Sequence, residues 1–343
     1  MSKIRNRWTW ISVALAVVAP AASANVAAAA TPLPAHVYAP YFETWTTDSL
    51  TATAQASGTN HFTLAFLETT GKSSCTLAWN GVRSQTVAQG RYLQDIATLR
   101  SMGGDVIPSF GGWSADQGGT EIGDSCKDVS AIAQAYESVV TTYGVTRLDM
   151  DIEGRSLTRT AGIDRRNAAI KMLQDWAAAT NHTVQVQYTL PTSAHGLEAS
   201  GLAVLQNAVA NHVRIDVVNP MVFDYYDRVT TDMGAAAISA LNGLHAQLTQ
   251  LLPSLSSPQI WAMEGATIMN GIDDYPRETE VTTMADAQDL LNFARSNGMS
   301  TLSMWAIQRD NGGCPGSGGA NDCSGIMQST WEFSHKLEPF TGP

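Results

Sequence analysis

Short β-branched or aromatic segments alternate with helical patterns along almost the whole chain. The strand-like segments are residues 37–42, 61–67, 105–110, 147–152, 183–190, 214–223, 259–263 and 301–307. The helical patterns cover residues 48–56, 91–102, 129–143, 164–180, 197–211, 233–251, 284–296 and 329–337. Strict alternation over about 250 or more residues, without a linker, predicts an α/β fold whose parallel strands close into a single (β/α)8, or TIM, barrel rather than an open doubly wound sheet.

The amino terminus has the layout of a secretory signal peptide. Basic residues within positions 3–7 precede an apolar run over residues 11–19, and small residues follow it. We therefore expect a signal peptide over residues 1–30, a single domain over residues 31–343, and a secreted, extracellular protein. The alternative is an N-terminal anchor that stays uncleaved. No other segment approaches the roughly 20 apolar residues that span a bilayer.

The acidic charge of the chain excludes two classes of partner. The sequence has 20 basic and 31 acidic side chains and a formal net charge of −11. Loss of residues 1–30 removes three cations and no acids, which leaves −14. Because such a surface repels nucleic acid and anionic membranes, we expect neither as a partner. The charge is compatible with a neutral substrate.

The four cysteines are an even number in a chain that is expected to be exported, which favours two disulfides, with three pairings possible in principle. Cys75 follows the second predicted strand and Cys126 the third, so both fall in adjacent loops at one rim of the barrel. Cys314 and Cys323 share the glycine-rich loop after the eighth predicted strand. We therefore expect the pairs Cys75–Cys126 and Cys314–Cys323. No cysteine or histidine spacing is typical of a zinc site, and we expect neither a metal nor a cofactor.

Three acids occupy alternate positions at the end of the fourth predicted strand. Because successive side chains of a strand point to opposite faces, Asp149, Asp151 and Glu153 line one face at intervals of about 7 Å, and Met150 and Ile152 line the other. Repulsion between stacked acids raises at least one pKa, which supplies a proton donor near neutral pH. In a TIM barrel the carboxyl ends of the strands face the active site, so Glu153 is expected at the pocket.

Two other interpretations fit the spacing of these acids. The strand end could be a structural one, with its charges satisfied by Arg147, Arg155 or helix N-termini. The three carboxylates could also bind a cation.

Three motifs occur in a specific order. Ser109-Phe110-Gly111-Gly112-Trp113 ends the third predicted strand, Asp149-Met150-Asp151-Ile152-Glu153 ends the fourth, and Met304-Trp305 lies in the eighth. Together they resemble glycoside hydrolase family 18, the chitinases. Residues 219–225, 309–311 and 323–326 resemble segments of secreted bacterial chitinase catalytic domains, so the resemblance spans residues 31–343.

The resemblance implies a retaining reaction in which no enzyme carboxylate attacks the sugar. Glu153 would protonate the glycosidic oxygen and later activate water. The acetamido oxygen of the substrate would attack the anomeric carbon and form an oxazolinium ion. Asp151 would bind the acetamide N–H and stabilise the developing charge, and Asp149 would share a proton with Asp151 from one layer below.

The resemblance also implies substrate-binding residues. Trp305 would form the floor under the distorted sugar, although a tryptophan that fills the barrel core is the alternative. Met221 and Asp224 match the family pattern Met-x-Tyr-Asp, whereas Phe223 replaces its tyrosine. We expect Tyr225, two residues further along the strand, to supply the missing hydroxyl.

Further aromatic residues lie at or just past strand ends. Tyr41, Trp45, Trp113 and Tyr226 could stack on sugar rings, and packing in the core or at the rim explains each of them equally well.

The expected function is a secreted chitinase that hydrolyses β-1,4 bonds between N-acetylglucosamine units, with chitin or its oligosaccharides as partner and a monomer as the working state. Larger family members insert an α+β domain after the seventh strand. Here only residues 264–283 follow the predicted strand, so we expect no insert, an open groove and internal cleavage. The rivals are an endo-β-N-acetylglucosaminidase acting on N-glycans and a non-catalytic chitin-binding lectin on the same barrel.

Overall fold

The computed structural model describes residues 32–274, 280–318 and 321–342. The predicted signal peptide, residues 1–30, lies outside the described residues. Among the described helices, none is both long and apolar enough to cross a bilayer.

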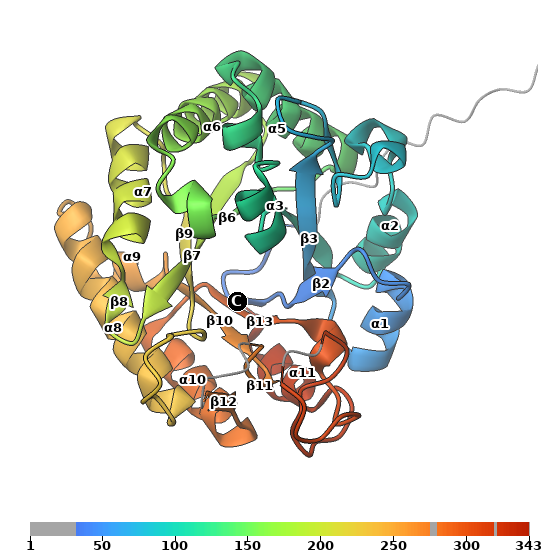
Figure 1. Cartoon of the computed structure of the whole chain (residues 1–343), viewed down its shortest axis with the longest axis vertical. Helices are drawn as coiled ribbons and strands as arrows, with labels where there is room; N and C mark the ends of the chain where they lie inside the picture. The colour runs from blue at the N-terminus through green and yellow to red at the C-terminus, as the bar shows by residue number, and fades with distance from the viewer. Residues whose placement is uncertain (1–31, 275–279, 319–320, 343) are drawn as a thin grey trace, which may run out of the picture.

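A curled parallel sheet forms the centre of the molecule, and helices surround it (Figure 1). The order of neighbouring strands is β1, β13, β10, β9, β7, β6, β5, β3, β2. Their bounds are β1 Val37–Tyr38, β2 Tyr41–Glu43, β3 His61–Thr69, β5 Asp105–Gly111, β6 Arg147–Asp151, β7 Gln185–Ser193, β9 Val217–Met221, β10 Gly265–Met269 and β13 Thr301–Trp305.

The first barrel strand is divided into β1 and β2, and this division closes the sheet. β1 pairs in parallel with β13, whereas β2 pairs in parallel with β3. Pro40, between the two halves, has no N–H to donate, but its carbonyl still accepts from Thr63 at 3.0 Å. Ala39 donates to Leu302 on the other side at 2.9 Å, so the two ends of the sheet are joined through one stretch of chain.

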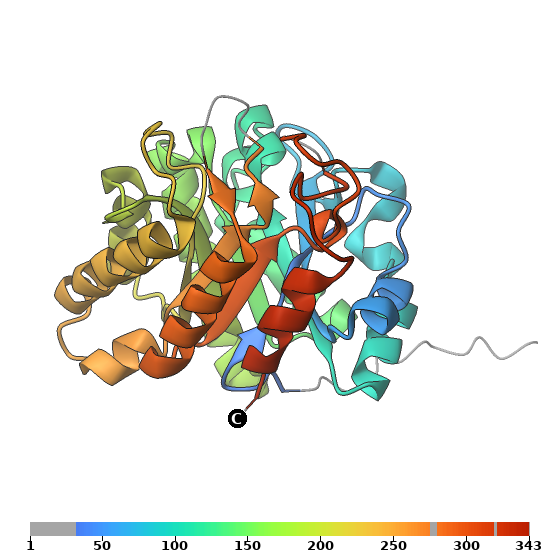
Figure 2. The same ribbon diagram turned by 90° about the horizontal axis from the view of Figure 1, so that it is seen from below.

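Most of the helices cover the outside of the barrel, whereas α3 lies at the mouth of the cavity (Figure 1). Their bounds are α1 Leu50–Ser57, α2 Leu93–Ser101, α3 Trp113–Gly118, α4 Ile122–Ser125, α5 Val129–Tyr143, α6 Thr160–Thr180, α7 Ala199–Ala210, α8 Met233–Leu251, α9 Ser257–Trp261, α10 Met284–Asn297 and α11 Glu332–Leu337. Asp128 begins α5 by accepting from Ser130 and Ala131, and Gly144 ends it in the left-handed conformation. In the side view of Figure 2 the C-terminus lies at the end of the barrel opposite the long rim loops.

The predicted (β/α)8 barrel is confirmed, but one predicted strand is wrong. Residues 259–263 fall largely within the short helix α9, and the seventh barrel strand is β10. Ser256 and Gln259 form a capping box and Pro258 lies in the first turn, which are helix-start signals that outweigh the apolar run.

The rim loops carry short hairpins rather than an inserted domain. β4 (Leu77–Trp79) pairs with β3, β8 (Gly196–Leu197) pairs with β7, and β11 (Gly271–Ile272) pairs with β12 (Val281–Thr282), each antiparallel. Between β10 and α10 there are only residues 270–283, which is too short for an α+β domain.

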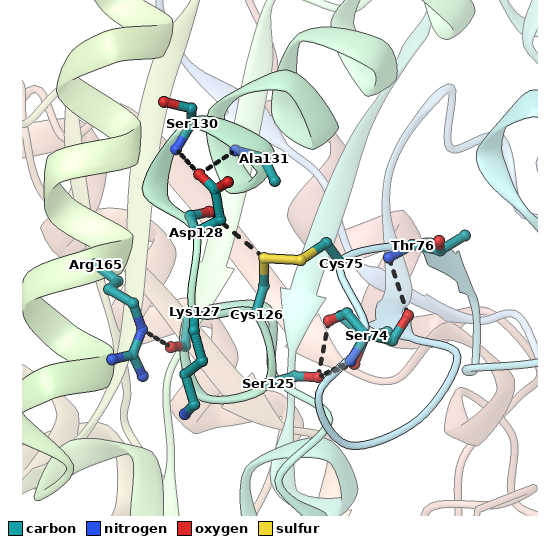
Figure 3. The surroundings of a disulfide bond; sticks show 12 residues. Ser74, Cys75, Thr76, Ser125, Cys126, Lys127, Asp128, Ser130, Ala131 and Arg165 are labelled. Atoms are coloured by element: carbon teal, nitrogen blue, oxygen red, sulfur yellow. Dashed lines mark hydrogen bonds between the residues drawn. A yellow bond between two sulfur atoms is a disulfide. The ribbon is translucent and has the colours of Figure 1, made fainter.

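Both predicted disulfides are present, and Cys75–Cys126 ties two rim loops together (Figure 3). Its Cα atoms are 4.8 Å apart. Beside it, Ser125 Oγ donates to the carbonyl oxygens of Gly71 and Ser74, at 2.9 Å in each case. The bond therefore fixes the loop after β3 to the segment that enters α5, at the rim where the strands end.

Candidate active site

A cavity of about 650 Å³ opens at the carboxyl ends of the barrel strands. Most of the predicted site residues line it, including Asp151, Glu153 and Trp305. The complete lining is Tyr41, Trp45, Phe66, Glu68, Asn80, Trp113, Ser114, Asp151, Glu153, Thr189, Met221, Phe223, Asp224, Tyr226, Thr267, Met269, Asp274, Trp305 and Asn321. Aromatic rings and carboxylates dominate this lining, and none of these residues is basic.

Asp149 lies below the cavity and is completely buried. Its Oδ2 accepts from Tyr41 Oη at 2.8 Å and Ser109 Oγ at 2.6 Å, and its Oδ1 accepts from Thr189 Oγ1 at 2.7 Å and Gln187 Nε2 at 3.0 Å. Burial raises its pKa, and these donors oppose the rise. The charge of Asp149 is one of the causes that raise the pKa of Asp151, so the two acids influence each other's protonation.

Asp151 is the last residue of β6 and is 3% exposed. Its Oδ1 has no hydrogen-bond partner among the described residues. Burial raises its pKa well above the ordinary value, and the charges of Glu153, Asp149 and Asp116 raise it further. A buried acceptor without a donor is costly, so this oxygen is prepared to receive an N–H from a bound ligand.

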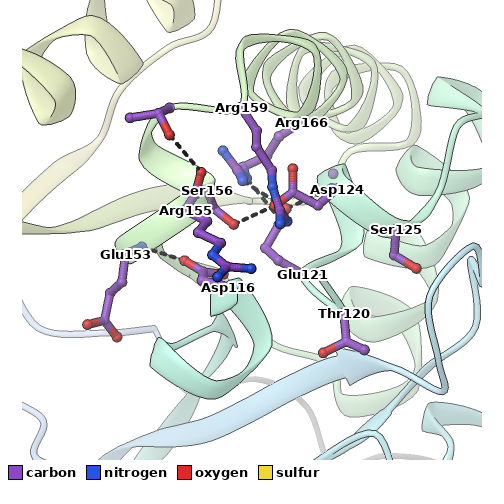
Figure 4. A network of polar contacts seen from close by, with 12 residues as sticks. Asp116, Thr120, Glu121, Asp124, Ser125, Glu153, Arg155, Ser156, Arg159 and Arg166 are labelled. Atoms are coloured by element: carbon purple, nitrogen blue, oxygen red, sulfur yellow. Dashed lines mark hydrogen bonds and ion pairs between the residues drawn. The ribbon is translucent and has the colours of Figure 1, made fainter. Parts of the chain in front are cut away.

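Glu153 follows β6 in an extended conformation, with φ −132° and ψ 176°, and its side chain is half-buried at the cavity. Its backbone N–H donates to Asp116 Oδ2, and Figure 4 shows its carboxylate pointing away from that contact. Burial raises the pKa of Glu153 to about 7; the nearby Asp274 adds to the rise and a hydrogen bond from the Trp113 N–H opposes it. A carboxyl group with this pKa can both donate and accept a proton near neutral pH.

Aromatic rings form one wall of the cavity. Trp305 and Phe66 are stacked, with centroids 5.6 Å apart and planes at 13°. Tyr41 and Trp45 contact the same indole at centroid distances of 5.5 and 6.0 Å. Tyr41 is 1% exposed and is bonded to Asp149, so most of its ring is covered, whereas Trp45 and Trp113 are 44% and 58% exposed.

The segment after β9 differs from the prediction. β9 ends at Met221, and Asp224 adopts a positive φ of 52°, so the strand does not persist to Tyr225. Tyr225 is buried in the hydrophobic core and is absent from the cavity lining. The expectation that its hydroxyl faces the pocket is therefore wrong, and Tyr226, which does line the cavity and interacts with Asp224, lies in that place.

Two adjacent glycines allow close approaches next to the acids. Gly111 has φ +97°, and a Cβ there would lie 2.2 Å from the Asp151 carbonyl oxygen. Gly112 has φ +82°, and its Cβ would lie 2.5 Å from the Phe66 ring. Any side chain at either position would push apart the acid strand or the aromatic wall.

Among the described residues, one group of three acids near the cavity could hold a metal ion. Single carboxyl oxygens of Asp224, Asp273 and Asp274 lie within 4.8 Å of one another. Burial, together with the charges of Asp273 and Asp274, raises the pKa of Asp224 to about 9. Asp224 therefore holds a proton at neutral pH, which relieves the repulsion among the three acids.

A polar network supports the loop beneath Glu153 (Figure 4). Arg166 of α6 pairs with Glu121 at 2.8 Å, and Arg159 pairs with Asp124 at 2.8 Å. Asp124 also accepts from Ser156 Oγ at 2.5 Å. The network joins the segments of α4 and α6 to the turn that begins at Gly154, directly after the predicted acid.

Sequence reasoning missed several residues of the cavity region. Phe66 lies on a predicted strand without a distinctive motif, and Asp116 lies in α3, where no helix was predicted. Glu68, which belongs to no motif, lines the cavity and accepts from Thr120 Oγ1 at 2.8 Å. The signal for Asp116 was its position three residues after Trp113, on the same side of a first helical turn.

Comparisons with known proteins show the family of the chain. The chain matches the family described as "Glycosyl hydrolases family 18" over residues 37–300. It is 34% identical over 322 residues to the probable bifunctional chitinase/lysozyme of Escherichia coli (strain K12), and 35% identical over 287 residues to endochitinase 11 of Metarhizium anisopliae. These alignments cover 90% and 81% of this chain, but the chain spans only 35% and 53% of the lengths of the two relatives.

Solved structures give the same result. Active domain 2 of a chitinase from Pyrococcus furiosus matches with a TM-score of 0.79 at 30% identity, covering 91% of this chain and 96% of that chain. A structure of the same domain complexed with chito-oligosaccharides matches with a TM-score of 0.79 at 29% identity, covering 93% and 97%. The expectation drawn from the three sequence motifs is confirmed, and the chain belongs to glycoside hydrolase family 18.

Proposed function

We propose that this glycoside hydrolase is a chitinase that cleaves β-1,4 bonds between N-acetylglucosamine units with retention. The observation that carries the proposal is the unpartnered, buried Oδ1 of Asp151 next to Glu153. An acetamido group of the substrate supplies the N–H that this oxygen lacks. Cellulose and starch have no such group, so they leave the buried acceptor unsatisfied.

The proposed reaction uses Glu153 as acid and then as base. Its pKa of about 7 provides the proton for the leaving oxygen. Asp151 orients the acetamide so that its carbonyl oxygen attacks the anomeric carbon, and its negative charge stabilises the oxazolinium ion. Asp149, held by four donors, fixes the position of β6 beneath Asp151, shares a proton with Asp151 and tunes the titration of the pair.

The shape of the rim supports internal cleavage of chains. Only residues 270–283 separate β10 from α10, so no inserted domain encloses the groove there. The proposed working state is a monomer. The two disulfides and the N-terminal sequence pattern support an extracellular location.

Product analysis tests the proposal. Purified protein is incubated with the hexamer of N-acetylglucosamine and, separately, with a glycoprotein that carries high-mannose N-glycans. We expect dimers, trimers and tetramers from the hexamer, and no released glycan. Glycan release without hexamer cleavage would identify an endo-β-N-acetylglucosaminidase, and hexamer binding without cleavage from pH 4 to 9 would identify a lectin; either result overturns the proposal.

A further inference from the structure

We propose that Asp116 is the positioning residue of Glu153, and that the first turn of α3 holds the acid at both its backbone and its carboxylate. This inference rests on the proposed function and assigns a task to a residue outside the three-acid motif. Asp116 Oδ2 accepts the backbone N–H of Glu153 (Figure 4), and the backbone N–H of Trp113 donates to the Glu153 carboxylate.

The two contacts form a reciprocal arrangement. Trp113 is the first residue of α3, where a backbone N–H has no acceptor within its own helix. Asp116 lies about one turn later in the same helix, and its Oδ2 accepts from the Glu153 N–H. A capping box satisfies two donors in this reciprocal manner within one helix end. Here the partner is a distant segment, and that segment is the proton donor.

The burial of Asp116 indicates that the carboxyl group has a specific task. Asp116 is 0% exposed, and its Oδ1 has no hydrogen-bond partner among the described residues. Burying such a group costs free energy unless its contacts compensate. The described side-chain hydrogen bond of Asp116 to a residue outside α3 goes to the Glu153 N–H. This contact therefore offsets part of the cost of burying Asp116.

The surroundings keep α3 against the acid. Gly154 has φ +43°, and a Cβ there would lie 2.3 Å from Gln117 Nε2 and 3.3 Å from the Trp113 ring. The chain after Glu153 is therefore in close contact with α3 on a second side. Fixing the backbone of Glu153 in its extended conformation fixes the direction in which its carboxyl group reaches the scissile bond.

The same geometry sets the proton affinity of Glu153. Burial, with the charge of Glu121, raises the pKa of Asp116 well above its ordinary value, which favours the neutral form of this acid. If Glu153 swings away from the Trp113 N–H, it loses a bond that favours its charged form, and its pKa rises.

Two variants separate the acceptor from the carboxyl group. Asp116→Asn keeps an oxygen for the Glu153 N–H, whereas Asp116→Ala removes it. With the hexamer as substrate, we expect kcat of Asp116→Ala to fall about 10²-fold, as for a displaced catalytic group, with KM within about threefold. The basic limb of its kcat/KM profile moves to higher pH. For the separate variant Asp116→Asn, we expect kcat and the pH profile of kcat/KM to stay near the wild-type values.

Asp124→Ala is the matched control, because Asp124 is a buried acid of the same network that contacts Ser156 and Arg159 rather than Glu153. It should lower the melting temperature without moving the pH profile. The inference is overturned if Asp116→Ala keeps kcat within about threefold of wild type, if its basic limb stays in place, or if Asp116→Asn is equally impaired. These outcomes differ from a failure of the proposed function, because in that case the wild-type protein itself would leave the hexamer uncleaved.

Discussion

The indole of Trp305 and the ring of Phe66 stack at 13° with their centroids 5.6 Å apart. The two residues come from β13 and β3, which are far apart in the sequence and lie on either side of the divided first strand. The stack is possible because Gly112 leaves room for the Phe66 ring. It presents a flat apolar surface beside Asp151 and Glu153, which suits the apolar face of a pyranose.

Loss of this surface is expected to weaken productive binding. Trp305→Ala should reduce kcat/KM on the hexamer about 10- to 100-fold, because a large buried contact of about 1.5–3 kcal/mol is removed. Trp176→Ala is the control, since Trp176 stacks on His182 away from the cavity. Steady-state kinetics on the hexamer distinguish a sugar-binding tryptophan from one that only packs in the barrel. An unchanged kcat/KM in Trp305→Ala would show that it only packs there.

Removal of the proton donor is expected to abolish turnover while binding persists. Glu153→Gln should lower kcat by several orders of magnitude, and Asp151→Asn should also be severely impaired because the charge opposite the oxazolinium is lost. Asp175→Asn, at an exposed acid paired with Lys171, should retain full activity. Calorimetric binding of the hexamer by Glu153→Gln checks that its cavity is intact. Near-normal turnover in this variant would remove Glu153 from the mechanism.

The pH dependence follows from the raised pKa of Glu153. The acid must be protonated to cleave the bond, so kcat/KM should fall as the pH rises through about 7. If Glu153 had the ordinary glutamate pKa of 4.5, kcat/KM would begin to fall more than two pH units lower. Initial rates from pH 4 to 9 on a soluble oligomer measure this limb. Constant activity up to pH 9 would contradict the assignment.

Two neighbouring tyrosines provide an internally controlled test of the pocket. Tyr226 lines the cavity and interacts with Asp224, whereas the ring of Tyr225 lies in the core. Tyr226→Phe should raise KM or lower kcat several-fold with little change in melting temperature. Tyr225→Phe should leave both kinetic constants unchanged. The opposite result would restore Tyr225 as the source of the hydroxyl missing at Phe223.

Features that depend on local patterns could be predicted from the sequence. Val129–Tyr143 and Met233–Leu251 agree with the predicted helices at both ends, because Asp128 and Asp232 are strong N-caps. The acids of β6 were placed by their period of two. The cysteine pairs followed from the loop order of the barrel, which brings Cys75 and Cys126 to one rim.

Features that depend on backbone turns and long-range packing could not be predicted. The positive φ of Asp224 ends the extended run and exchanges the roles of Tyr225 and Tyr226, and the modest preference of aspartate for positive φ is too weak to predict it. The apolar residues within 259–263 favoured a strand, whereas the capping box of Ser256 and Gln259 begins a helix there. The contact between Asp116 and Glu153 joins segments 37 residues apart that follow the paired strands β5 and β6, and no local pattern signals it.

The anomeric form of the first product tests the central claim most directly. Proton nuclear magnetic resonance during hexamer hydrolysis by the wild-type protein distinguishes the two anomers at the newly formed reducing end before they equilibrate. Attack by the substrate's acetamide followed by attack of water inverts the centre twice, so the β-anomer should accumulate first. Initial accumulation of the α-anomer would show a single displacement by water and would contradict the role assigned to Asp151.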